Sequence, residues 1–140
     1  MSNTRFQTLF MSLLLLLSSS LALAAEDDGG AVKKTPGYVS LGKPMVLNLA
    51  TDGRRLAFLQ IQADVLVKDD EAKEVVEANI PAIRHKLIVM LSEQNATDMK
   101  TPAKREEIRK QVTDAVRDMI EEMTNNNDID EVLFSSFLVQ

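Results

Sequence analysis

The chain of 140 residues is long enough for one domain of ordinary size. Its formal net charge of −5 argues against a nucleic-acid partner, because proteins that bind nucleic acids present a basic patch to the phosphates. The absence of cysteine excludes disulfides, thiolate metal sites and cysteine nucleophiles.

Residues 1–24 have the three parts of a secretory signal peptide. Arg5 supplies the positive start, Leu9–Leu17 the apolar run, and Ala22 and Ala24 the small residues of a cleavage signal, so we expect a mature chain that begins at Ala25. The alternative is an uncleaved membrane anchor over residues 9–25. That run contains four serines and is shorter than the roughly 20 apolar residues of a typical spanning helix. Either interpretation places the chain after residue 25 across a membrane.

Residues 25–37 are predicted to form a flexible linker. They combine glycine, proline and mixed charge without apolar periodicity. The acids at 26–28 would point in different directions along an extended chain, so we interpret them as solvated side chains rather than as metal ligands. The folded domain is then expected over residues 38–140.

The first part of this domain is predicted to form an antiparallel sheet. Residues 38–41 and 45–50 are strand-like, and Asp52-Gly53 before the next apolar run predicts a hairpin. The returning strand, residues 55–68, alternates strictly. Its apolar face consists of Ala57, Leu59, Ile61, Ala63, Val65 and Val67. One apolar and one mainly polar face are typical of a sheet that helices cover on one side.

Residues 70–94 are predicted to form a long amphipathic helix. Its core stripe is Val76, Ile80, Ile83, Leu87 and Leu91. Pro81 lacks an N–H and costs about 3 kcal/mol inside a helix. The apolar residues of the stripe keep their helical spacing across Pro81. Burying their side chains contributes about 1.5–3 kcal/mol each, which outweighs the cost of the proline. We therefore favour one kinked helix. The alternative is two helices, the second capped by Asn79 with Pro81 in its first turn.

A second long helix and a final strand complete the domain. After a polar link at 95–100, Thr101-Pro102 is a favourable helix start. Helical spacing continues through Ile108, Val112, Ala115, Val116, Met119, Ile120 and Met123, which we interpret as core residues. Residues 131–140 end the chain as a strand, which we expect at a sheet edge where its free backbone groups can pair with a neighbouring chain. The sequence therefore predicts an α+β fold, a mostly antiparallel sheet with two long helices packed on one face.

The sequence contains few candidates for catalytic, cofactor-binding or metal-binding residues. His85 is the only histidine, so no second imidazole is present to share a metal ion. Nucleophile elbows, Walker loops and glycine-rich dinucleotide turns are absent. We therefore predict a non-enzymatic protein with no catalytic, cofactor-binding or metal-binding residues.

Three segments, Tyr38–Leu49, Pro81–Arg84 and Val132–Gln140, together resemble the FliL family of flagellar basal-body-associated proteins. Leu91-Ser92, Asp98, Thr101, Ile108 and Arg109 also match the pattern of that family. The resemblance covers residues 38–140, and its specificity lies in the order and spacing of the segments.

The resemblance implies a periplasmic domain similar to the stomatin-type (SPFH) domain. It implies an oligomeric ring at the inner membrane, around the flagellar stator, that supports torque and swarming in chemotaxis-linked motility. The chain departs from the usual family start, a basic cytoplasmic tail followed by a longer anchor, so a soluble periplasmic relative is also compatible. A different class of function is a generic periplasmic ligand-binding or chaperone-like module, which needs a concave apolar site.

Overall fold

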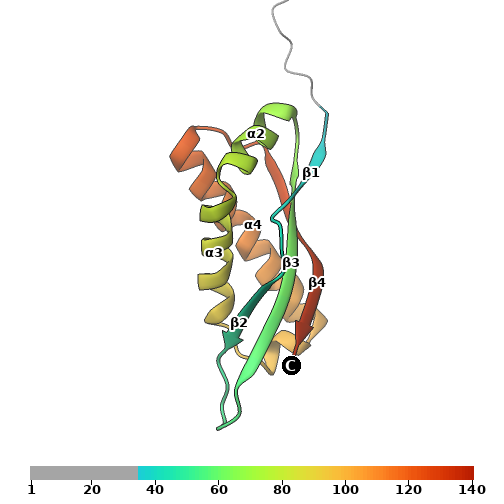
Figure 1. Cartoon of the computed structure of the whole chain (residues 1–140), viewed down its shortest axis with the longest axis vertical. Coiled ribbons are helices and arrows are strands. Elements are labelled where there is room, and N and C mark those ends of the chain that lie inside the picture. Colours follow the sequence, from blue (N-terminus) through green and yellow to red (C-terminus); the bar gives the residue numbers. More distant parts are fainter. Residues whose placement is uncertain (1–34) are drawn as a thin grey trace, which may run out of the picture. The chain divides into compact units, whose positions relative to one another are not determined.

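The computed structural model describes residues 35–140. In this part of the chain, four strands and three α-helices occur in the order β1 (Gly37–Ser40), β2 (Met45–Leu49), β3 (Ala57–Val67), α2 (Asp70–Ala78), α3 (Ile80–Ser92), α4 (Pro102–Thr124) and β4 (Ile129–Val139). A 3₁₀ turn, η1 (Asp98–Lys100), precedes α4. The helices lie on one face of the sheet (Figure 1), which confirms the predicted α+β class.

Strand β3 is the centre of the sheet. Strands β1 and β2 pair with successive parts of β3 along one of its edges, and β4 pairs with it along the other edge. Leu66, for example, lies between Tyr38 of β1 and Glu131 of β4. All three pairings are antiparallel, as the sequence predicts. Strand β4 therefore forms one edge of the sheet.

The predicted hairpin between β2 and β3 is present, but its connection is wider than a two-residue turn. The last paired residues are Leu49 and Ala57, so Asp52-Gly53 lies inside a longer loop. Ala50 leaves the hairpin because its N–H donates to Gln94 O at 3.0 Å and its carbonyl accepts from Ala96 N at 2.9 Å. These bonds join the end of β2 to the segment after α3 and widen the loop.

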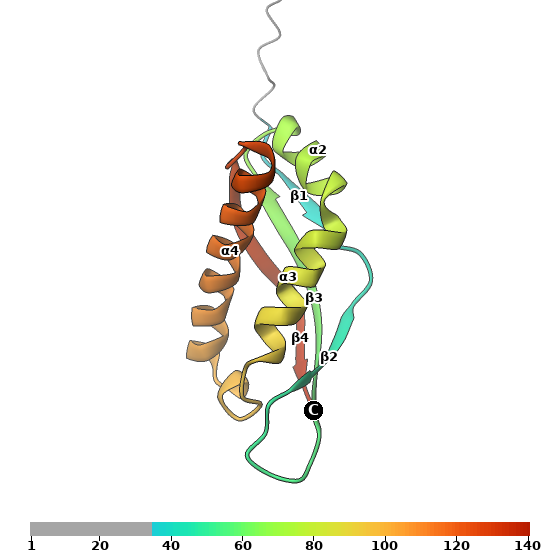
Figure 2. The same cartoon turned by 90° about the vertical axis from the view of Figure 1, so that its left-hand side faces the viewer.

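The core lies between the helices and the apolar face of β3. From Leu59 to Val67, the alternate residues expected to face the helices are at most 1% exposed. Four residues of the core stripe, Val76, Ile83, Leu87 and Leu91, are 0% exposed, and Ile80 packs partly buried against them. Figure 2 shows α3 and α4 side by side over this face.

The favoured interpretation of residues 70–94 as one kinked helix is wrong, and so is the expectation of two long helices. Helix α2 ends at Ala78 and α3 begins at Ile80, because Asn79 (φ −110°) leaves the helical conformation. The Asn79 N–H bonds back to Val76 O, its side chain donates to Val75 O, and its carbonyl accepts from Ile83 N. Pro81 then lies in the first turn of α3, where no N–H is needed.

The start of α4 agrees with the sequence prediction, whereas the burial of Met99 and Met123 on either side differs from it. Thr101 caps α4, its hydroxyl accepting from Lys104 N at 3.3 Å, and Asn125 ends the helix in the left-handed region (φ 57°). The supposedly polar link before it contains Met99, which is fully buried within η1. The expectation that Met123 lies in the core is wrong, because the residue is 54% exposed.

Candidate functional site

Strand β4 pairs with β3 on one side only, so alternate backbone groups point away from the sheet. Phe58 and Gln140 exchange two hydrogen bonds of 2.9 Å each, which fixes the phase of the ladder. Since Gln60 pairs with Leu138, the N–H and C=O of Leu138 point toward β3. Those of its neighbours Phe137 and Val139 therefore point outward, along the free edge.

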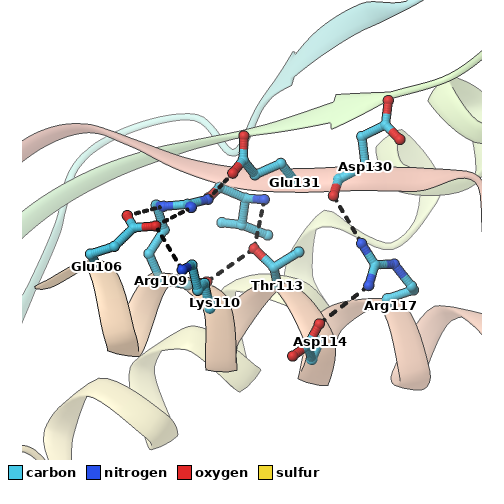
Figure 3. A network of polar contacts seen from close by, with 9 residues as sticks. Glu106, Arg109, Lys110, Thr113, Asp114, Arg117, Asp130 and Glu131 are labelled. Carbon is cyan, nitrogen blue, oxygen red and sulfur yellow. Dashed lines mark hydrogen bonds and ion pairs between the residues drawn. The ribbon is translucent and has the colours of Figure 1, made fainter. Parts of the chain in front are cut away.

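Helix α4 covers the first half of this outer edge. The Thr113 hydroxyl, 5% exposed as a residue, accepts from Val132 N at 3.0 Å. Arg117 donates from Nε to Ile129 O at 3.1 Å and from Nη2 to Asp130 O at 2.9 Å. Figure 3 shows these side chains reaching from α4 to β4. The outward groups at the start of β4 thus have hydrogen-bond partners.

An ion-pair network reinforces the same contact. Arg109 donates to both carboxylate oxygens of Glu106 at 2.8 Å and also bonds to Glu131 of β4. The hydrogen bond from Arg109 is the main reason that the pKa of Glu106 falls from its ordinary value of 4.5 to about 2. The bond to Glu106 in turn raises the pKa of Arg109. Arg109 is therefore fully engaged, and its charge is compensated by two acids.

The second half of the edge is open. Between it and the first turns of α4 lies a pocket of about 310 Å³, lined by Pro102, Arg105, Glu106, Arg109, Phe134 and Phe137. A smaller pocket of about 180 Å³ shares Arg105 and Phe137 and is also lined by Met99, Lys100 and Val139. We call these two pockets together the β4 groove.

Arg105 is the cation that distinguishes this groove. Its guanidinium carbon lies 5.5 Å from the centre of the Phe137 ring, and Phe137 lies 5.6 Å from the ring of Phe134. Its Nη2 donates to Lys100 O at 3.4 Å. Within residues 35–140, its buried Nε has no hydrogen-bond partner and no carboxylate forms an ion pair with it. The groove therefore contains a half-buried positive charge that no carboxylate in residues 35–140 compensates.

The residues predicted from sequence lie elsewhere. Ala22, Ala24 and Ala25 are outside the described residues, the core stripe lies inside the domain, and His85 is exposed on α3. In the described part of the chain, no three acidic or histidine side chains are grouped as metal ligands. Over the same residues, no helix has both the length and the apolar character needed to cross a membrane.

Sequence patterns alone do not predict the β4 groove. The detectable signal is the four-residue spacing of Arg105, Arg109, Thr113 and Arg117, which places the groove cation on the same face of α4 as the side chains that close the first half of β4. Only the hydrogen bonds in the structure show that this face meets the edge of β4. Chemically, the groove presents aromatic faces, outward backbone donors and acceptors of β4, and positive charges from Lys100 and Arg105 that no ion pair among the described residues compensates.

The fold defines the class: a small α+β domain with one antiparallel sheet that helices cover on one face. Within that class its family is established, because the family model "Flagellar basal body-associated protein FliL" matches residues 38–140. The chain belongs to the FliL family, as the resemblance implied. This is a flagellar structural family associated with the basal body at the bacterial cell envelope. A search of curated proteins finds no match.

Proposed function

We propose that this protein is a non-enzymatic component of the flagellar motor that supports stator function, torque and swarming. Membership in the FliL family is the observation that carries the proposal. The protein would act in the periplasm at the inner membrane, held there by an N-terminal anchor or, after cleavage, by its partners. Its domain would share the architecture of the stomatin-type domain.

The partner we propose is the periplasmic linker of the peptidoglycan-binding stator subunit. Around it, copies of this protein would form a ring, and contacts between two different patches on each copy are what closes such a ring. Each contact between small domains buries only a modest area, so association would be weak in isolation and promoted by crowding at the motor.

The helix-free face of the sheet supports self-association. Val46 and Leu138 flank Gln60 on this face, and they are 67% and 47% exposed. Phe58 is 40% exposed one pair further along the same face, and Tyr38 is 66% exposed near the other end of the sheet. Apolar side chains clustered on an exposed face are typical of a protein contact surface. We propose that this face is one of the two patches in the ring.

The second candidate function is a periplasmic ligand-binding or chaperone-like module. The β4 groove favours it, because an open apolar groove with a few polar groups accommodates an extended segment. Such a module would need no motor partner.

Deletion of the gene separates the two functions. The motor role predicts reduced swimming under viscous load and reduced swarming, both restored by the wild-type gene. A photoreactive amino acid at Val46 should crosslink to a second copy in cells, whereas the same group at Lys73, exposed on α2, should not. Normal motility, with no crosslink of the tagged protein to a stator or basal-body component, would overturn the motor proposal.

A further inference from the structure

We infer that the β4 groove binds an extended, acidic segment of a partner polypeptide, which adds to β4 as a further strand. The inference does not depend on the motor role, because the groove would recognise such a segment whichever envelope protein supplied it. It rests on three properties of the groove: free backbone groups, aromatic contact surface and uncompensated charge.

The free backbone groups lie on the second half of β4. Helix α4 provides hydrogen bonds to the edge at Ile129, Asp130 and Val132. Within residues 35–140, nothing bonds to the outward N–H and C=O groups of Phe137 and Val139. An extended peptide pairs with alternate residues of such an edge through its own main chain. Because α4 closes the first half of β4, an added strand is confined to the second half.

The side chains of the groove then select the strand. Phe137 and Phe134 pair with Ile61 and Ala63 on the helix-covered face of the sheet, and both rings stay partly exposed beside α4. A peptide on this edge would place every second side chain against these rings and Pro102. Apolar residues at those positions would remove the exposed ring surface from water.

The positive charge of the groove predicts an acidic residue in the partner segment. Arg109 is compensated by Glu106 and Glu131, but Arg105 has no carboxylate among the described residues. Lys100 lines the same groove. A carboxylate beside Arg105 would form a charge-assisted hydrogen bond with its guanidinium, because no acid among the described residues forms an ion pair with that group. The segment should therefore carry an acidic residue between apolar ones.

A second copy of this chain fits the groove less well. The opposite edge of the sheet is flanked by Lys43 and by Arg84, which donates to Leu41 O at 2.6 Å and Lys43 O at 2.8 Å. Pairing that edge with β4 would bring cations toward Arg105. A symmetric pairing of two β4 strands would bring the two Arg105 side chains together. Like charges oppose both arrangements.

The test measures fluorescence anisotropy of a labelled peptide mixed with the purified full-length protein. The probe is a short peptide of alternating threonine and valine with one central glutamate. Two variants separate the contributions: Arg105→Gln removes the charge, and Val139→Pro removes one outward N–H without touching the bonds between Leu138 and β3. Proline is tolerated at such an edge position. Lys73→Gln removes one positive charge far from the groove and is the matched control.

We expect saturable binding that Arg105→Gln weakens about tenfold or more, the loss of one hydrogen bond to a charged group. Val139→Pro should weaken it at least as much, with an unchanged circular dichroism spectrum, and Lys73→Gln should leave it unchanged. A probe with lysine in place of glutamate should bind weakly. Equal binding of the two probes, or unaltered binding to both groove variants, would overturn the inference. So would dimers that Val139→Pro abolishes, because a second copy would then occupy the groove.

Discussion

The contact between Thr113 and Val132 gives a sharp test of how α4 closes the first half of β4. The Thr113 hydroxyl accepts from Val132 N at 3.0 Å and donates to Arg109 O at 3.0 Å. Valine has nearly the same shape as threonine, so Thr113→Val removes the hydroxyl without leaving a cavity. The N–H of Val132, a residue that is 0% exposed, would lose its partner. An unpaired buried donor costs about 1–3 kcal/mol.

Thermal unfolding followed by circular dichroism measures this cost. In a domain of this size, 1 kcal/mol corresponds to roughly 4–8 °C in melting temperature, so a cost of about 1–3 kcal/mol should lower the melting temperature of Thr113→Val by about 4–24 °C. Thr113→Ser keeps the acceptor and should lose less. Glu122→Gln, at an exposed position of the same helix without a side-chain hydrogen bond or ion pair among the described residues, should change stability by about 0.5 kcal/mol or less. If Thr113→Val had the same melting temperature as the wild type, the claim that this hydrogen bond holds α4 against the first half of β4 would be wrong.

Three further predictions concern the core, the ion pairs and the amino terminus. Ile83→Asp puts an unpaired charge at a position that is 0% exposed, so it should lower the free energy of unfolding by several kcal/mol. Lys86→Asp on the same helix should lower it by about 0.5 kcal/mol or less. If Lys86→Asp had the lower melting temperature of the two, the assignment of the buried face of α3 would be wrong. Because the pKa of Glu106 in the folded protein (about 2) lies below its ordinary value of 4.5, its bond to Arg109 stabilises the fold at and above pH 4.5, and this contribution is lost as the pH falls toward 2. Glu106→Gln should therefore flatten the dependence of melting temperature on pH between those values, and an unchanged slope would show that the bond is not formed in solution. Amino-terminal sequencing of the cellular protein should find a chain that begins at Ala25, and an intact amino-terminal methionine on membrane-bound protein would favour the anchor.

Local patterns account for the parts of the fold that sequence predicts. The alternation between Leu59 and Val67 identifies the central strand because side chains on a strand change face at every residue. The start of α4 follows from Thr101 and Pro102, since the cap and the missing N–H both act within one turn. The amphipathic stripe likewise identifies the residues of α2 and α3 that face the sheet.

Features that depend on contacts between residues far apart in the chain cannot be predicted from local sequence patterns. The break at Asn79 is one of two alternatives that the sequence leaves open, because periodicity alone does not distinguish one kinked helix from two helices that share an apolar stripe. Met99 in η1 is fully buried, although its neighbours in sequence, Asp98 and Lys100, are polar. The role of Arg105 depends on its position over Phe137, 32 residues later in the chain.

Amide hydrogen exchange along β4 tests most directly the claim that the strand is closed by α4 in its first half and open in its second. In the protein alone, the amides of Val132 and Leu138 should exchange slowly, because one bonds to Thr113 and the other faces β3. The amides of Phe137 and Val139 should exchange fast and become protected when the glutamate-containing peptide is added. If these two amides were already as slow as that of Leu138 without peptide, the edge would be covered and the claim would be wrong.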